Sequence, residues 1–238
     1  MRPAWYALAS GGWRDYVTLL HPPYTAWHLS YVVVGGCLAP TVAWGRLGLA
    51  VLAFALALGV GAHALDELNG RPLRTRIPER MLVALAVGSV VAACAIGIAV
   101  AFASDPMLLV FVAVGAFLVP AYNLELLGGR FHSDLWFGLA WGAFPLLTGY
   151  AACAGRVSGG AVLAAAWATL LSLAQRQLST PVRRLRRQVR SVTGRLELAD
   201  GSSEALDADA LTSAPEAALR LLTAATVALA AALVVVRL

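Results

Sequence analysis

Four residues with imidazole, acidic and basic side chains are spaced so that one face of a helix carries them all. His63, Asp66, Glu67 and Arg71 stand at positions i, i+3, i+4 and i+8, and residues three or four apart lie on the same side of a helix. Two carboxylates in such a place can hold Mg²⁺, and a carboxyl group in a dry cavity can act as an acid. The alternative is that both acids simply end the helix and pair with Arg71 or Arg74. Asp66 and Glu67 therefore predict either a metal or acid–base site, or a plain helix end.

Aromatic and acidic residues also gather in the middle of the chain. Tyr122, Trp136 and Trp141 have ring faces that attract cations, so they could stabilise a carbocation. Their alternative role is packing or anchoring at a membrane interface. Either Ser133 or Asp134 can instead cap the start of a helix. The residue pattern therefore leaves both a carbocation site and a structural role open for this region.

The elements that position these residues are long hydrophobic runs. The run Leu47–Leu65 has no charged residue and is about as long as the 20 residues that a helix needs to cross a bilayer. Comparable runs recur along the chain, and together they predict seven membrane spans. These runs are Tyr24–Trp44, Leu47–Leu65, Met81–Ala103, Met107–Leu127, Leu135–Cys153, Val157–Leu178 and Pro215–Val236.

The composition indicates the same class of protein. Hydrophobic residues make up 60% of the chain and charged residues 13%, and the mean hydropathy is +0.74. A soluble domain of this composition would not stay in solution. We therefore predict an all-α, polytopic transmembrane bundle of about seven helices in one domain, residues 1–238.

The distribution of arginine predicts how the bundle lies in the membrane. All 18 basic residues are arginine, and only Arg46, Arg156 and Arg237 fall on one of the two sides. By the positive-inside rule, the N-terminal segment 1–23 is cytoplasmic, the C-terminus is outside, and the protein lies in the plasma (inner) membrane. Anionic membrane lipids explain this positive charge better than nucleic acid, which we do not expect as a partner.

Residues 179–214 are expected to form a cytoplasmic loop of two parts. In the basic stretch 183–195, apolar residues recur at spacings of three and four, which favours an amphipathic helix lying on lipid headgroups. The stretch 196–214 contains five acidic residues and no basic one. This composition is typical of a solvated linker.

Three motifs resemble the UbiA superfamily of intramembrane prenyltransferases. His63-x-x-x-Glu67-x-x-x-Arg71 stands where that family carries its first Asp-rich motif, at the end of its second transmembrane helix. The segment from Tyr122 to Tyr150, with Gly-x-x-x-Gly-x-x-Pro, is similar to the family's aromatic link into its fifth helix. The segment His21–Trp27 is similar to the start of its first helix. The resemblance covers about residues 15–190.

The resemblance implies a UbiA-like fold and transfer of a prenyl group from an isoprenyl (di)phosphate to a small-molecule acceptor. In the family, Mg²⁺ held by Asp-rich motifs neutralises the diphosphate; here Asp66 and Glu67 would be the metal ligands. The implied catalytic residues are Asp66, Glu67 and Asp134. The implied substrate-binding residues are His63, Arg71, Arg74, Arg76, Tyr122, Arg130, His132, Gln175 and Arg176.

The sequence departs from the family pattern in two respects. Family members usually have nine helices, whereas about seven are expected here. The second Asp-rich motif of the family is replaced by Gln175-Arg176-Gln177-Leu-Ser-Thr-Pro-Val-Arg183, which has no acid. In one resolution, arginines replace metal around the diphosphate, since guanidinium groups bind phosphate through paired hydrogen bonds. In another, Asp66 or Glu67 protonates an olefin or epoxide, as in a membrane terpene cyclase. The third is a non-catalytic lipid-binding or scaffold protein.

Overall fold

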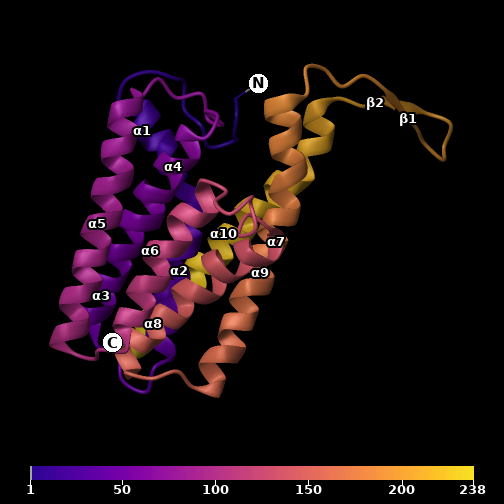
Figure 1. Cartoon of the computed structure of the whole chain (residues 1–238). Helices are drawn as coiled ribbons and strands as arrows, with labels where there is room; N and C mark the ends of the chain where they lie inside the picture. Colours follow the sequence, from indigo (N-terminus) through magenta and orange to yellow (C-terminus); the bar gives the residue numbers. More distant parts are fainter. Residues whose placement is uncertain (1) are drawn as a thin grey trace.

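The computed structural model describes residues 2–238, which form a bundle of helices with one small hairpin (Figure 1). The all-α prediction is confirmed. The chain begins with a short helix, α1 (Trp13–Leu19). The elements that follow are α2 (Pro22–Leu38), the continuous run of α3 (Trp44–Phe54), η1 (Ala55–Ala62) and α4 (His63–Leu68), α5 (Glu79–Ala103), α6 (Leu108–Asn123), the continuous run of α7 (Asp134–Gly138), η2 (Leu139–Ala143) and α8 (Phe144–Ala154), α9 (Gly159–Gln188), β1 (Arg195–Glu197), β2 (Ser203–Ala205) and α10 (Ala208–Arg237).

Within residues 2–238, four helices are long and apolar enough to cross a membrane: Trp44–Leu68, Glu79–Ala103, Asp134–Ala154 and Ala208–Arg237. Each of the other three predicted spans also contains a helix. α2 and α6 are shorter, with 17 and 16 residues, and α9 carries arginines in its last turns. The chain is therefore compatible with an integral membrane protein.

The predicted fourth span extends too far. It was expected over Met107–Leu127, but α6 ends at Asn123. Glu125 and Leu127 adopt positive φ angles of 51° and 56°, and two glycines that follow also have positive φ. A helix cannot continue through such residues, so the chain turns there although its residues are still apolar.

Helix α2 packs closely against α8 in the centre of the bundle. A Cβ atom at Gly35 would lie 2.0 Å from the carbonyl oxygen of Leu146, and one at Gly149 would lie 2.0 Å from that of Val32. Glycine at both positions lets the two backbones touch. Trp27, Tyr31 and Leu146 are fully buried around this contact.

The end of α9 and the start of α10 run side by side beyond the rest of the bundle and are joined by the hairpin β1–β2 (Figure 1). Residues 183–188 of the expected headgroup helix are helical and continue α9, which ends at Gln188, so the helix does not extend over the rest of 183–195. Arg186 holds residues 183–188 against α10 through two hydrogen bonds to the Glu216 carboxylate, of 2.5 and 2.8 Å. The expected linker 196–214 is also partly structured: Asp207 caps α10 by accepting from Ala210 N at 2.7 Å.

Candidate functional site

A polar cavity of about 590 Å³ lies between the ends of several helices. Its walls come from α2, α4, α6, α7 and α9, together with the segment that precedes α1. Its polar and charged lining residues are Tyr6, His21, Tyr24, His28, His63, Asp66, Asn69, Tyr122, Asn123, Glu125, His132, Gln175, Arg176, Ser179, Thr180, Arg183, Arg184, Arg187 and Gln188.

All four histidines of the chain line this cavity. In His28, His63 and His132, Nδ1 lies 2.8–3.1 Å from a backbone carbonyl oxygen. Because a carbonyl can only accept, Nδ1 carries a proton in all three rings. In the neutral ring Nε2 is then an acceptor, which can orient a guest or take its proton.

The fourth histidine, His21, differs from these three. Its Nδ1 is 2.8 Å from the hydroxyl of Tyr6, and its ring stacks on that of His63 with centroids 4.0 Å apart. Burial, reinforced by His63 and then by Arg187, lowers the pKa of His21 well below its usual range. The His21 imidazole is therefore neutral at neutral pH.

Arginines of α9 give the cavity an excess of positive charge. Arg176, Arg183, Arg184 and Arg187 line it, against two carboxylates. In the part of the chain that the structure describes, only Arg176 and Arg186 form ion pairs. The half-buried Arg183 donates to Thr180 Oγ1 at 3.2 Å and has no carboxylate partner. Burial, and then the charges of Arg187 and Arg176, lower the pKa of Arg183. Uncompensated guanidinium groups of this kind favour an anionic guest.

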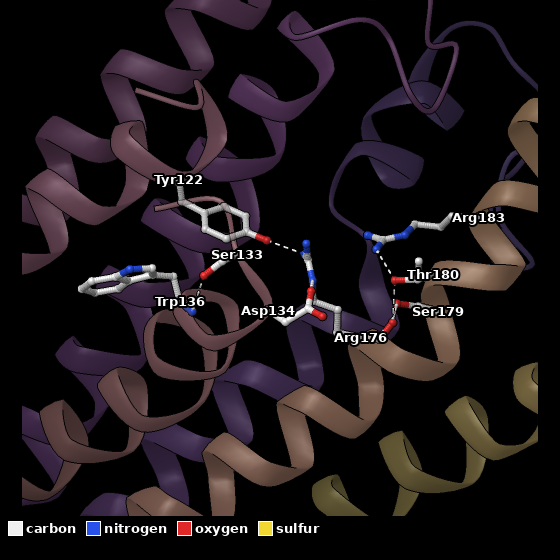
Figure 2. A network of polar contacts seen from close by, with 8 residues as sticks. All are labelled: Tyr122, Ser133, Asp134, Trp136, Arg176, Ser179, Thr180 and Arg183. Carbon is white, nitrogen blue, oxygen red and sulfur yellow. Dashed lines mark hydrogen bonds and ion pairs between the residues drawn. The ribbon is translucent and has the colours of Figure 1, made fainter. Parts of the chain in front are cut away.

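Figure 2 shows the polar contacts that surround Arg176. Its Nη1 donates to the Tyr122 hydroxyl at 2.6 Å, and its Nε donates to the Asp134 carboxylate. The guanidinium also lies over the Phe137 ring, 5.2 Å from the centroid. The structure thus brings together three predicted site residues from α6, α7 and α9.

The two acids of α4 have different surroundings, and the expectation that they face one cavity is wrong. Asp66 lines the cavity, and its carboxylate forms no hydrogen bond within residues 2–238. Glu67 is 0% exposed. Its carboxylate accepts from Leu73 N at 2.9 Å and from the backbone N and side-chain Oγ1 of Thr75, both at 2.8 Å. Neighbouring residues on a helix point about 100° apart, so Glu67 organises the loop that follows α4.

Four arginines expected at the substrate lie outside the cavity lining. Arg71 donates to the carbonyl oxygen of Ile77 at 2.6 Å, and Arg74 to that of Arg187 at 3.2 Å. Arg76 and Arg130 are exposed. For Arg71, Arg74 and Arg76 the physical reason is local: the loop of residues 69–78 folds around the Glu67 carboxylate, and the hydrogen bonds of the loop decide where its side chains point.

Unpaired polar atoms gather at the cavity. Within residues 2–238, three buried side-chain atoms lack a hydrogen-bond partner: Trp5 Nε1, His21 Nε2 and Gln175 Oε1. All three residues line the cavity. Since buried polar groups are almost always hydrogen-bonded in folded proteins, these atoms indicate a place for a polar guest.

The protein itself supplies few ligands for a Mg²⁺ ion. Mg²⁺ takes six oxygen ligands, usually one or two carboxylates together with waters and substrate phosphates, and within residues 2–238 the carboxylates that line the cavity are those of Asp66 and Glu125. His, Cys, Asp and Glu side chains of residues 2–238 form no group of three that could hold a metal. The magnesium expectation stays a prediction, and the arginines favour an anion.

A second, apolar pocket of about 110 Å³ adjoins the polar cavity. It lies among α3, η1, α5, α6, η2 and α8, and Arg46 stands at its other end. Leu58 and Trp141 line both spaces. An amphiphile with an anionic head and a hydrocarbon tail matches this pair of neighbouring spaces.

Sequence reasoning missed several lining residues. Arg187 follows Arg183 by four residues on α9, so helical spacing could have placed both on one face. Trp5, Tyr6 and His21 have no such signal, because they reach the cavity through a segment without periodicity. Comparisons of the chain with family models, with curated proteins and with solved structures found no match.

Proposed function

We propose that this protein is a UbiA-like membrane prenyltransferase that binds an isoprenyl (di)phosphate and transfers its prenyl group to a small acceptor. The observation that carries the proposal is the position of Arg183 and Arg187. Neither has a carboxylate partner within residues 2–238, and both line a cavity that shares Leu58 and Trp141 with an apolar pocket. The phosphate head lies against the arginines, and the chain passes Leu58 and Trp141.

The same charges suit the chemistry of prenyl transfer. The bond between C1 of the prenyl group and the diphosphate oxygen breaks, and its electron pair leaves with the diphosphate. Guanidinium groups already in place stabilise this developing charge, most strongly where water is excluded. The acceptor atom bonds to C1 and gives its proton to the Asp66 carboxylate or to Nε2 of a cavity histidine such as His63.

In the proposed arrangement the protein is one membrane domain of seven spans, and the polar cavity lies at its cytoplasmic end. The cavity is lined by the end of α4 and by α9, the two regions where the resembled family carries its acidic motifs. Here His63 and Asp66 face Gln175 and Arg183 across this space. This juxtaposition supports a related site in which arginine has taken over part of the role of metal.

A second candidate, a terpene cyclase, is favoured by one observation. The Asp66 carboxylate lines the cavity without a hydrogen bond to any described residue, as a proton donor to an olefin requires. A cyclase would release no diphosphate and would depend on Asp66 more than on the arginines of α9.

The decisive experiment measures binding and turnover of geranylgeranyl diphosphate by the purified protein. The test variant is Arg183→Gln with Arg187→Gln; the charge-matched control is Arg76→Gln with Arg80→Gln, which changes two exposed arginines outside the cavity. We expect binding to be lost in the test variant only. Equal binding by both variants contradicts the proposal.

The reaction products separate the alternatives. With a mixture of small phenolic acceptors, a transferase releases inorganic diphosphate, and an arm with EDTA shows whether added Mg²⁺ is needed. Conversion without diphosphate release that is lost in Asp66→Asn indicates the cyclase. Binding without any turnover indicates a lipid-binding protein.

A further inference from the structure

The segment that precedes α1 crosses the polar cavity. Pro3, Ala4, Trp5 and Tyr6 all line it, although these residues belong to no helix or strand. Ala4 is buried against Leu73 of the α4–α5 loop. The segment therefore forms part of the wall of the site.

Side chains from three other elements hold this segment in place. Arg187 of α9 donates from Nε to the carbonyl oxygen of Pro3 at 3.3 Å. The Tyr6 hydroxyl contacts His21 Nδ1 at 2.8 Å, and Arg220 of α10 lies 4.8 Å from the centre of the Trp5 ring. A segment held by a few side-chain contacts, without a backbone ladder, opens at lower free energy than the bundle.

The far end of the segment is anchored beside two glycines. Gly11 and Gly12 have φ angles of 120° and 61°, which glycine adopts without strain. The Gly11 N–H donates to Asp15 at 2.9 Å, and the same carboxylate accepts from Arg76 N at 2.8 Å. Asp15 is only 3% exposed. Nearer to the start of the chain, the Leu8 N–H donates to Thr18 Oγ1 of α1 at 3.0 Å, so the segment is fixed at Asp15 and at Leu8 and residues 3–6 form its free end.

Two N–H donors at the free end of the segment indicate a place for a ligand. The Nε–H of Arg187 that contacts Pro3 is also a donor that an anion in the cavity would use. The Nε1–H of Trp5 is buried beside the Tyr24 hydroxyl and forms no hydrogen bond of good geometry within residues 2–238. Because buried donors are almost always hydrogen-bonded, this N–H is available to an acceptor that a ligand supplies.

We propose that residues 3–6 form a lid that restricts entry to the polar cavity, and that Trp5 on this lid is a ligand-contacting residue. The proposal of a lid depends only on the presence of the cavity. The proposal that Trp5 contacts an anion depends on the proposed function.

The lid is tested by thiol labelling. Ser179, which is 7% exposed and lines the cavity, is changed to cysteine in a protein whose Cys37, Cys94 and Cys153 are alanine. A negatively charged methanethiosulfonate then reports access to the cavity. Deletion of residues 2–6, or Tyr6→Phe, which removes only the contact with His21, should raise the labelling rate about tenfold or more. Labelling of the exposed site Ser213→Cys should not change.

If Ser179→Cys is labelled at the same rate with and without the changes to residues 2–6, the proposal of a lid is wrong. Because Tyr6→Phe alters one hydroxyl, this result remains available even if the deletion variant fails to fold.

The role of Trp5 is tested by the affinity for inorganic diphosphate and for geranylgeranyl diphosphate. Trp5→Phe keeps a ring beneath Arg220 but removes the N–H, and should weaken binding about tenfold. Trp13→Phe, at a side chain that is 67% exposed, should bind as the wild type does. Unchanged binding by Trp5→Phe overturns the contact. If the wild type binds neither compound, the proposed function and this contact fail together, while the labelling rates still decide the lid.

Discussion

The arginines of α9 and those of the α4–α5 loop (residues 69–78) lie at the same end of the molecule, since Arg74 donates to the backbone of Arg187. Only the α9 set lines the cavity. Arg176, Arg183 and Arg187 are spaced by seven and four residues on one long helix, so they share a face. The loop arginines follow no period.

This difference shows what organises each region. The face of a long helix is set by periodicity, and its side chains point together whatever the neighbours do. The loop is organised by Glu67, which satisfies two backbone N–H groups and one hydroxyl. The arginines of α9 therefore point into the cavity together. The arginines of the α4–α5 loop point to solvent or to backbone carbonyl groups.

The largest expected effect concerns the loop. Glu67→Ala leaves three donors of Leu73 and Thr75 without their acceptor, at about 1–3 kcal/mol for each buried group that stays unsatisfied. We expect the free energy of unfolding to fall by about 3 kcal/mol or more, measured by thermal unfolding in detergent. Glu79→Gln, at an exposed acid that begins α5, is the control. Normal stability with lost diphosphate binding would instead make Glu67 a residue of the site.

The next effect concerns α9. Arg183→Gln should weaken binding of inorganic diphosphate by about 2 kcal/mol, roughly thirtyfold, because hydrogen bonds between charged groups contribute about that much. Titration calorimetry measures it. Thermal stability should not fall, because the change removes a charge that lies near Arg187 and Arg176. Unaltered affinity would remove the distinction between the two sets of arginines.

A smaller effect concerns pH, through the neutral His21 beside the α9 arginines. Its pKa is lowered in the folded protein, so below about pH 6.5 the unfolded chain binds a proton that the native state refuses. The contribution of the neutral His21 to the free energy of unfolding is thus fully present well above pH 6.5 and decreases as the pH falls. At pH 5.5 we expect the protein to be less stable than at neutral pH by on the order of 1 kcal/mol. The loss is read as the difference between wild type and His21→Gln in thermal unfolding at both pH values. Parallel pH profiles for the two proteins would contradict it.

The smallest effect completes the comparison. Arg76→Gln removes an exposed guanidinium whose residue is tied to Asp15 only through its backbone N–H. Because exposed charges contribute about 0–1 kcal/mol, diphosphate affinity should change less than about fivefold. A drop as large as that of Arg183→Gln would show that the loop arginines also reach the ligand.

Much of the fold was predictable from the sequence, because apolar runs of sufficient length form helices wherever they lie. Tyr122, Asp134 and Arg176 were each expected at the site, in the scheme that the family resemblance implies, but their direct contact was not predicted. The role of Glu67 was not predicted either, since its partners are loop N–H groups that have no sequence signature. The lid was also unpredictable, because the contact between Pro3 and Arg187 joins residues 184 positions apart.

The π-helical run η1 makes the α4 site tolerant of one change in the length of the chain. A π-helical turn holds about one residue more than an α-helical turn, and η1 ends directly before His63. If one residue of Ala55–Ala62 were deleted, a return to regular α-helix would remove the extra residue of the turn and leave the residues after it facing nearly as before. In a regular α-helix such as α5, the same deletion would rotate all later residues by about 100°. A single codon lost from η1 would thus shorten this helix and still leave Asp66 directed towards the cavity and Glu67 towards its loop.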